Sequence, residues 1–180
     1  MFKLFQYRGV SSEAGIFRQI PLNVKGRLYV SPMPFGAYDT RNQLMGLYRE
    51  YKIEHVYIIA TDEEIKRKAR RDIRGDYQKI GATFRQLPIQ DMTAPDLSSI
   101  RQIVMDAVMR LQKSRIAIHC HAGVGRTSVL TCCVVQAVQQ LAPDDSIAYV
   151  KKHMEVNMTS EQMSAVRRFR TAQDEAPEQA

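Results

Sequence analysis

The chain has 180 residues, of which 44% are hydrophobic and 25% charged, as is usual for one soluble globular domain. Its formal net charge of +7 predicts attraction to an anionic partner, although charge alone does not choose among nucleic acid, a membrane surface and a phosphorylated substrate. The longest apolar runs fall far short of the roughly 18 residues of a membrane span, and the first residues lack the pattern of a secretory signal. We therefore expect a cytoplasmic protein without a transmembrane segment.

Strand and helix patterns alternate along the chain. Short apolar or β-branched runs predict strands, in chain order, at residues 26–34, 53–61, 82–89 and 115–120. Helical spacing and turn signals predict helices at residues 39–52, 64–79, 95–111, 126–141, 144–153 and 159–169. Because strands that alternate with helices pair in parallel, the predicted fold class is α/β, with a central, mostly parallel sheet flanked by helices.

Helix caps and domain boundaries can also be predicted. Asp39 or Thr40 is expected to cap the first helix, and Thr61 and Glu64 have the spacing of a capping box before the second. The chain shows no internal repeat or composition break, so residues 1–170 are predicted to form one domain. Within it, residues 1–25 are an N-terminal extension without an assigned role, and the polar residues 171–180 beyond it are expected to be a disordered tail.

The excess positive charge is concentrated in the second helix. Six of the nine residues from Lys66 to Arg74 are Lys or Arg. Two interpretations stay open: a solvated helix face, as most charge runs are, or a steering surface for a polyanionic substrate.

The stretch "AIHCHAGVGRTSVL", Ala117 to Leu130, joins a predicted buried strand to a predicted helix through a loop that contains glycines. Ligands bind at the carboxyl ends of parallel strands, where a helix N-terminus offers unpaired N–H groups to an anion. Gly123 and Gly125 allow the backbone to curl so that successive N–H groups point inward. The loop is therefore a candidate phosphate cradle, formed by His121, Ala122, Gly123, Val124, Gly125 and Arg126.

Two side chains give this loop a possible chemistry. Partial positive charge at the helix N-terminus and a nearby guanidinium both favour the thiolate of Cys120, which would make it a nucleophile. Arg126 stands six residues later, and its planar fork suits two oxygens of one phosphoryl group.

These residues resemble a known signature. "HCHAGVGRTS" is similar to the His-Cys-x5-Arg-Ser/Thr loop of the cysteine-dependent protein tyrosine phosphatases, and most of the chain resembles their compact dual-specificity type. The resemblance implies that Cys120 attacks phosphorus and that Arg126 stabilises the transferring group. It also implies that His119 influences the ionisation of the cysteine, and that the hydroxyl of Thr127 assists departure of the thiolate.

The chemistry also needs a proton donor for the leaving oxygen. The candidate is Asp91, 29 residues before Cys120, in "LPIQDMTAPDL", which resembles the general-acid loop of the same phosphatases. Asp96 is the rival carboxylate, although it stands where it would cap the helix at 95–111. Gln162 resembles the glutamine that helps place the hydrolytic water, and it could equally complete a helix cap with Thr159.

Three further residues have more than one interpretation. His121 could select substrates or be a tolerated polar residue at the entrance of the loop. Cys132 and Cys133 are expected to pack in a buried helix, and disulfide exchange with Cys120 is the alternative. The cysteine spacing fits neither a disulfide framework nor a zinc site, so we expect no metal and no cofactor.

The expected function is hydrolysis of phosphate monoesters through a cysteinyl-phosphate. Phosphotyrosine or phosphoserine/threonine in proteins is the leading substrate class, and an inositol phosphate or phosphoinositide is the second, suggested by His121 and the basic helix. The resemblance also allows hydrolysis of RNA 5′-triphosphates as a third hypothesis. A phosphate-binding module without turnover is an alternative of a different class, which the combination of Cys120, Arg126 and Asp91 disfavours. Nucleic acid is not the expected partner.

Overall fold

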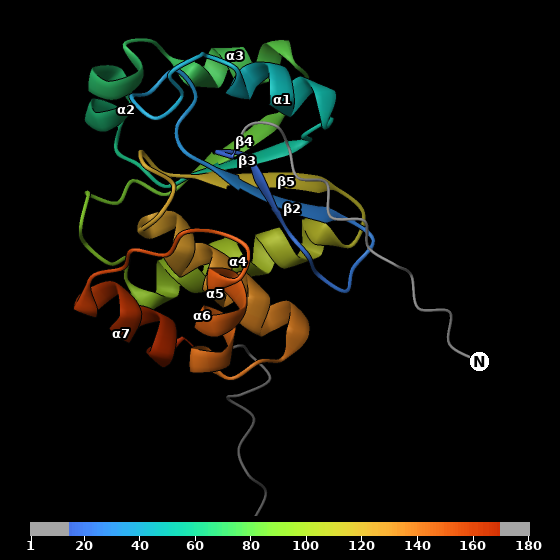
Figure 1. Cartoon of the computed structure of the whole chain (residues 1–180), viewed down its shortest axis with the longest axis vertical. Coiled ribbons are helices and arrows are strands. Elements are labelled where there is room, and N and C mark those ends of the chain that lie inside the picture. The colour runs from blue at the N-terminus through green and yellow to red at the C-terminus, as the bar shows by residue number, and fades with distance from the viewer. Residues whose placement is uncertain (1–14, 170–180) are drawn as a thin grey trace, which may run out of the picture.

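The computed structural model describes residues 15–169 of the chain. Two helical layers enclose a central sheet: α1, α2 and α3 cover one face, and α4, α5, α6 and α7 cover the other (Figure 1). The expected tail at residues 171–180 and most of the N-terminal extension lie outside the described residues. The helices are α1 (Leu44–Glu50), α2 (Asp62–Ala69), α3 (Ile73–Lys79), α4 (Leu97–Leu111), α5 (Arg126–Gln139), α6 (Pro143–Lys151) and α7 (Ser160–Arg168).

The sheet has five strands in the order β1-β2-β5-β3-β4. Strand β5 lies at its centre and pairs in parallel with β2 and β3, and β3 pairs in parallel with β4. The predicted α/β class with a mostly parallel sheet is confirmed. The strands are β1 (Arg18–Ile20), β2 (Arg27–Ser31), β3 (His55–Ile58), β4 (Thr83–Gln86) and β5 (Arg115–His119).

Strand β1 is antiparallel to β2 and forms one edge of the sheet. No strand was predicted there, because only three residues pair and they show no alternating pattern. The segment is nevertheless part of the fold: Phe17 and Ile20 are buried in the two separate layers of the core. Residues 15–25 thus contribute to the domain rather than extending from it.

The predicted start of the first helix is wrong. The helix begins at Leu44, and its N-cap residue Gln43 makes no capping hydrogen bond through its side chain. Asp39 is buried, and its carboxylate accepts hydrogen bonds from the backbone N–H groups of Phe35 and Gln43. It also accepts a hydrogen bond of 3.4 Å from the N–H of Leu44, the first residue of α1, so Asp39 braces the loop between β2 and α1 and still serves the start of this helix, which lies later than predicted.

The predicted basic helix at 64–79 is in fact two helices. Helix α2 ends at Ala69, because Arg70 after it adopts a left-handed conformation with φ of 55°, and such a residue stops a helix. Helix α3 then begins after Asp72, whose side chain accepts a hydrogen bond from the N–H of Arg74. The basic residues are consequently divided among α2, α3 and the turn between them, which holds Arg70 and Arg71, instead of following one continuous face.

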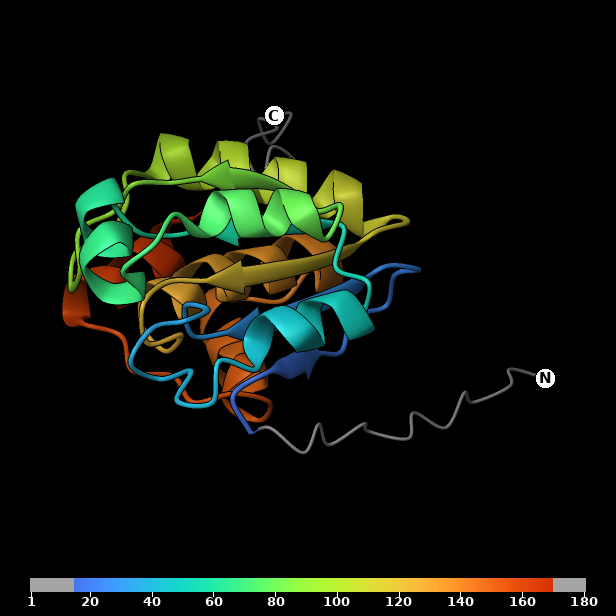
Figure 2. The same ribbon diagram turned by 90° about the horizontal axis from the view of Figure 1, so that it is seen from above.

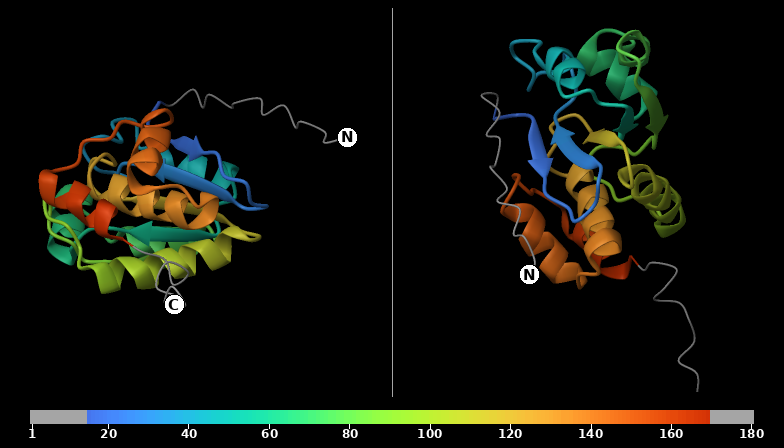
Figure 3. Two further views of the ribbon diagram at one scale, coloured as in Figure 1. Left: turned by 90° about the horizontal axis from the view of Figure 1, so that it is seen from below. Right: turned by 90° about the vertical axis from the view of Figure 1, so that its right-hand side faces the viewer.

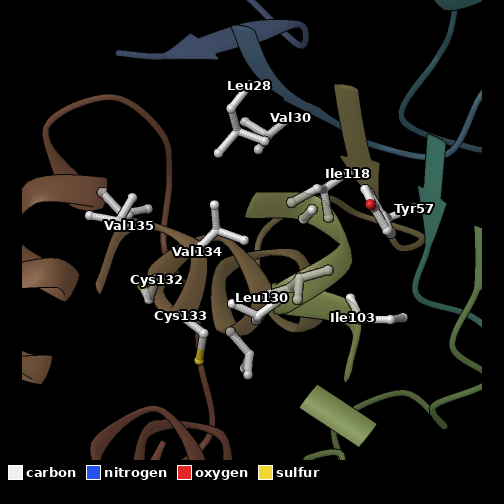
Figure 4. Packing of buried hydrophobic residues seen from close by; sticks show 14 of the residues in the cluster. Leu28, Val30, Tyr57, Ile103, Ile118, Leu130, Cys132, Cys133, Val134 and Val135 are labelled. Atoms are coloured by element: carbon white, nitrogen blue, oxygen red, sulfur yellow. The ribbon is translucent and has the colours of Figure 1, made fainter. Parts of the chain in front are cut away.

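The core consists of two clusters, one on each face of the sheet. Figure 4 shows Cys132 and Cys133 on α5 in the neighbourhood of apolar side chains of the larger cluster. Both thiols are fully buried, and burial raises the pKa of Cys132 to about 12. The prediction that these cysteines pack in a buried helix agrees with their surroundings.

The parallel strands all end at the same edge of the sheet. Helix α2, the start of α7 and the segment from residue 87 to 96 gather near that edge (Figures 2 and 3). The loop that follows β5 also lies at this edge. The carboxyl end of the central strand is therefore surrounded by segments that are distant in sequence. This is where the topology predicts a ligand site.

Candidate active site

The central strand and the helix that follows it position the candidate nucleophile. Residues 116–119 of β5 are buried on both sides, as expected of an inner parallel strand. Cys120 follows the strand directly and is buried, and Arg126 is the first residue of α5. Cys120 and Arg126 therefore lie at the two ends of one short loop at the N-terminus of a 14-residue helix.

The loop is curled around the sulfur of Cys120. The backbone N–H of Gly123 donates a hydrogen bond to Cys120 Sγ at 3.3 Å. Gly123 has φ of +82°, and a Cβ there would lie 2.7 Å from the carbonyl oxygen of Ser31. Only glycine fits this position without displacing backbone atoms. The carbonyls of His121 and Val124 accept hydrogen bonds from outside the loop, from the N–H groups of Met33 and Asn157.

Arg126 is held by a carboxylate that the sequence did not indicate. Its Nη1 and Nη2 donate to the two oxygens of Glu64, at 2.6 and 2.8 Å, and both side chains are buried. Nη1 also donates to the Ile89 carbonyl. Burial works against the charge of Arg126, but hydrogen bonding to Glu64 and the charges of Cys120, Glu64 and Asp91 raise its pKa above the usual value.

Glu64 is thus the site residue that sequence reasoning assigned elsewhere. The predicted capping box is half present, because Thr61 accepts a hydrogen bond from the Glu64 N–H. The Glu64 carboxylate, however, extends to Arg126 rather than back to the helix start. Glu64 is one of three acidic residues in the first turn of α2, so no local signal distinguishes it, and its partner is 62 positions away in the sequence.

The two rival carboxylates have different surroundings. Asp91 accepts a hydrogen bond from Arg126 Nη2 at 3.0 Å, while its side chain remains 65% exposed. Asp96 is the N-cap of α4, as predicted, and accepts hydrogen bonds from the N–H and hydroxyl of Ser99, which lower its pKa. The structure brings Asp91 to the arginine of the loop and leaves Asp96 at a helix end.

The histidine before the cysteine is fully buried. Its Nδ1 lies 2.9 Å from the Cys120 carbonyl oxygen, which can only accept, so Nδ1 carries the hydrogen. Its Nε2 then accepts from the hydroxyl of Tyr77 at 2.6 Å. Burial lowers the pKa of His119 to about 4, against the opposing effect of the Cys120 hydrogen bond. His119 is therefore neutral near pH 7 and touches the cysteine through its backbone.

Thr127 and Gln162 occupy different places around the loop. Thr127 is fully buried, and its hydroxyl has no hydrogen-bond partner among residues 15–169. Gln162 forms the capping box with Thr159, and its Nε2 donates to the Thr93 carbonyl at 2.9 Å. A Cβ on Gly125 would lie 3.4 Å from Gln162 Oε1, so Gln162 lies against the loop of residues 120–126, which we call the phosphate loop. Gln162 thus connects this loop with α7 and with the segment that carries Asp91.

Several donors of the site lack protein partners. Within the described residues, Arg126 Nε and His121 Nε2 are buried without a hydrogen bond. Together with the N–H groups of the loop, they are the groups that an oxyanion could satisfy. The arrangement can therefore bind an anion, hold a thiol against it and present a carboxylate from an exposed loop.

Comparison with known families agrees with this chemistry. A family model described as "Polymorphic toxin system, DSP-PTPase phosphatase" matches residues 35–139, which include Asp91, Cys120 and Arg126. The chain belongs to this phosphatase family. The resemblance to the cysteine-dependent tyrosine and dual-specificity phosphatases is thereby confirmed.

Curated relatives of this DSP-PTPase chain match over about half of it. Protein tyrosine phosphatase domain-containing protein 1 from Bos taurus is 32% identical over 94 residues, which are 52% of this chain and 12% of that protein. Cyclin-dependent kinase inhibitor 3 from Mus musculus is 26% identical over 100 residues, 55% of this chain and 47% of that protein. The matched part is thus less than half the length of either relative.

Solved structures share the fold of the DSP-PTPase chain. Kinase associated phosphatase, in a form with its catalytic-site cysteine replaced by serine, has a TM-score of 0.72 at 18% identity, covering 83% of this chain and 90% of that one. PTPMT1 has a TM-score of 0.68 at 17% identity, covering 84% and 91%. Within residues 15–169, no helix has the length and apolar character to cross a membrane, and no cluster of His, Cys, Asp and Glu is suited to a metal ion.

Proposed function

We propose that the chain hydrolyses phosphate monoesters through a cysteinyl-phosphate on Cys120. The observation that supports this most directly is the hydrogen bond of 3.0 Å between Asp91 and Arg126, in the loop whose Gly123 N–H contacts Cys120 Sγ. A nucleophile, an anion-binding guanidinium and a carboxylate of an exposed segment thus belong to one site. These are the groups that the two-step reaction needs.

In the first step the thiolate of Cys120 attacks phosphorus, and an S–P bond forms as the ester P–O bond breaks. Arg126 and the N–H groups of the loop stabilise the charge on the equatorial oxygens. The leaving oxygen takes a proton from the carboxyl group of Asp91, so that an alcohol or phenol departs.

In the second step water attacks the cysteinyl-phosphate. The carboxylate of Asp91 accepts a proton from the water, the S–P bond breaks, and inorganic phosphate and the thiolate are formed. We assign to Thr127 the hydroxyl that donates to the departing thiolate, since it is buried beside the loop and has no partner among the described residues. Gln162 lies against Gly125 and is the candidate for placing the water, although its amide already bonds to Thr93.

Phosphotyrosine and phosphoserine/threonine in proteins are the proposed main substrates. The names of the relatives support this class, since one is a protein tyrosine phosphatase domain-containing protein and one solved neighbour is kinase associated phosphatase. The proposed reaction uses neither a metal nor another cofactor, and its proposed location is the cytoplasm.

An inositol phosphate or phosphoinositide is the second candidate substrate. A solved neighbour, PTPMT1, is described in complex with PI(5)P, at a TM-score of 0.65. In this chain, the positive charge of Lys68 acts on His121 in the phosphate loop, which favours a substrate with more negative charge than one phosphate. A phosphate-binding module without turnover would need neither the nucleophile nor the acid.

The test is release of inorganic phosphate in the presence of a chelator, from phosphotyrosine peptide, phosphothreonine peptide and inositol phosphates. The intact protein is expected to release phosphate, and Cys120→Ser is expected to release none. Trapping of phosphate on the protein at acid pH and its absence from Cys120→Ser would identify the covalent intermediate. Release that persists in Cys120→Ser would refute the proposed chemistry.

A further inference from the structure

The candidate acid Asp91 belongs to a short exposed segment. Residues 90–92 are exposed, whereas Ile89 before them is buried, and the segment lies beside the start of α7 (Figures 1 and 2). We call residues 89–93 the acid segment. An exposed chain samples many conformations unless other groups hold it. The position of the Asp91 carboxyl group therefore depends on where the acid segment is attached.

The acid segment is attached at both of its ends. At one end, Nη1 of Arg126 donates to the Ile89 carbonyl at 2.8 Å, and at the other, Nε2 of Gln162 donates to the Thr93 carbonyl at 2.9 Å. The first attachment comes from the phosphate loop and the second from the first turn of α7. Asp91 stands two residues from each of these carbonyls, so the two contacts limit how far its backbone can move.

The contacts of Gln162 also fix the orientation of its amide. Its Oε1 accepts from the backbone N–H of Thr159 at 3.1 Å, and its Nε2 donates to the Thr93 carbonyl. An N–H requires an acceptor and a carbonyl requires a donor, so both contacts select the same orientation. Gln162 is 2% exposed, and buried hydrogen bonds are costly to lose. One side chain thus completes the cap of α7 and holds the acid segment.

Thr159 adds a second contact from the same cap. Its hydroxyl donates to the Met92 carbonyl at 3.4 Å and accepts from the N–H of Gln162 at 3.2 Å. Met92 has φ of 64°, in the left-handed region that a residue with a Cβ adopts only where its surroundings require it. The N–H of Met92 donates to Asp91 Oδ1 at 3.1 Å. The turn after the candidate acid therefore contacts α7 through its carbonyl and the acid through its N–H.

Helix α7 is itself attached to the helix that follows the phosphate loop. Gln136 on α5 is buried, and its Nε2 donates to the Val166 carbonyl on α7 at 3.2 Å. Both helices contribute side chains to the larger core cluster. The start of α7 thus has a defined place relative to the phosphate loop, and it can serve as a fixed support for the acid segment.

We propose that Gln162, together with Thr159, is a positioning residue for Asp91. The cap of α7 holds the acid segment so that the Asp91 carboxyl group lies at the phosphate loop before substrate binds. This proposal rests on the proposed phosphatase function and adds a role for Gln162 in its first step, when the leaving oxygen takes a proton. Placing the hydrolytic water would act in the second step alone, so the two roles predict different kinetics.

The first experiment measures how activity depends on the leaving group. The kcat/KM for phenyl phosphate is divided by that for p-nitrophenyl phosphate, whose nitro group stabilises the leaving phenolate and reduces the need for an acid. Gln162→Glu keeps the acceptor for the Thr159 N–H, but its carboxylate cannot donate to Thr93, and Gln162→Met loses both contacts without adding a charge. Each variant is expected to lower the ratio about tenfold, because a displaced acid loses part of the roughly 100-fold or more that general-acid catalysis contributes.

Two controls test whether this effect passes through Asp91. Gln136→Met removes a buried amide contact to a carbonyl of α7 but leaves the acid segment untouched, so it should lower stability without changing the ratio. In the Asp91→Asn background, Gln162→Glu should not lower the ratio further, since the acid is already absent. A further decrease in that background, or an equal decrease in Gln136→Met, would overturn the proposal.

The water-placing role gives a different kinetic result. Loss of a residue that only places water slows breakdown of the cysteinyl-phosphate, so kcat falls while kcat/KM is unchanged, and a burst of phenol equal to the enzyme concentration appears. If both Gln162→Glu and Gln162→Met behave in this way and keep the ratio of the intact protein, the positioning role is wrong.

Hydrogen exchange needs no turnover and separates this proposal from the proposed function. The N–H groups of Met92 and Thr93 both donate within the acid segment. Their exchange is expected to become about tenfold faster in Gln162→Met and to stay unchanged in Gln136→Met. Faster exchange in a protein that releases no phosphate would support the attachment to α7 and refute the phosphatase function. Phosphate release with unchanged exchange and an unchanged ratio in Gln162→Met would leave that function standing and refute the positioning role.

Discussion

Glu64 and Arg126 form a buried ion pair in which both nitrogens of the guanidinium fork contact both carboxylate oxygens, at 2.6 and 2.8 Å. The pair joins α2 to the first residue of α5, at the end of the phosphate loop. It fixes the plane of the guanidinium, because a bidentate contact restricts rotation as well as position. Glu64 is therefore a positioning residue for Arg126.

Replacing Glu64 by Gln is expected to lower both activity and stability. Breaking one partner of a buried ion pair costs about 3 kcal/mol of unfolding free energy, and misplacement of Arg126 should lower kcat about 100-fold. The measurements are steady-state kinetics and urea unfolding. Glu63→Gln removes the same charge from an exposed neighbour and should change neither value. A loss of stability with unchanged kcat would show that Glu64 is only structural.

Replacing Asp91 by Asn is expected to lower kcat about 100-fold or more for alkyl and peptide phosphates, because the leaving oxygen then departs without a proton. The loss should be smaller for an aryl phosphate whose leaving group is stable as an anion. Stability should change little, since the Asp91 side chain is 65% exposed. Asp96→Asn is the control, because Asn also caps a helix, and it should retain full activity. Loss of activity in Asp96→Asn alone would reverse the assignment.

The elements near the central strand were predictable because their signals are local. Strand β5 is a short apolar run, and the Cys-x5-Arg spacing that follows it defines the loop within one stretch of sequence. The caps at Asp96 and Thr159 likewise depend on residues within one helical turn. For these elements, the local pattern and the tertiary structure require the same conformation.

The rest depends on contacts between distant segments. Strand β1 is defined by pairing with β2 rather than by its own three residues, and the end of α2 depends on a left-handed Arg70. Asp39 accepts hydrogen bonds from the N-terminal amides of α1, at Gln43 and Leu44, from four and five positions away, and this contact depends on the tertiary structure of its loop. The local sequence identifies Glu64 only as a capping residue, because its partner Arg126 is 62 positions away and contacts it only in the folded structure.

Stability is expected to fall as the pH is lowered from about 6.5 to 4. The ordinary pKa of histidine is about 6.5, whereas burial lowers that of His119 to about 4. Between these values His119 binds a proton in the unfolded chain and not in the folded chain, so this residue contributes a decrease of about 3 kcal/mol in the free energy of unfolding. His55, whose pKa burial also lowers to about 4, contributes in the same pH range. The folded contribution is therefore complete above pH 6.5 and lost as the pH falls to 4.

Urea unfolding at several pH values between 7 and 4 measures this effect. His119→Asn should reduce the slope, whatever its absolute stability, because one of two histidines with a pKa of about 4 is gone, and His55 should keep part of the dependence. His153→Asn removes a partly exposed histidine and should flatten it less. If the slope is the same for the intact protein and for His119→Asn, His119 has the ordinary pKa of histidine in the folded chain, and the fold does not keep it neutral.

Gly123→Ala is expected to abolish activity and to destabilise the protein. The backbone there has φ of +82°, which costs a residue with a Cβ about 1 kcal/mol or more, and the new Cβ would lie 2.7 Å from the Ser31 carbonyl oxygen. The loop must shift, and the N–H that contacts Cys120 Sγ moves with it.

Gly75→Ala is the matched control: it lies within α3, a Cβ there meets nothing within 4 Å, and Ala stabilises a helix by up to about 1 kcal/mol. The temperature of thermal unfolding should therefore fall in Gly123→Ala and rise in Gly75→Ala. Phosphate release should be lost only in Gly123→Ala. Full activity in Gly123→Ala would show that this N–H does not help to hold the thiolate.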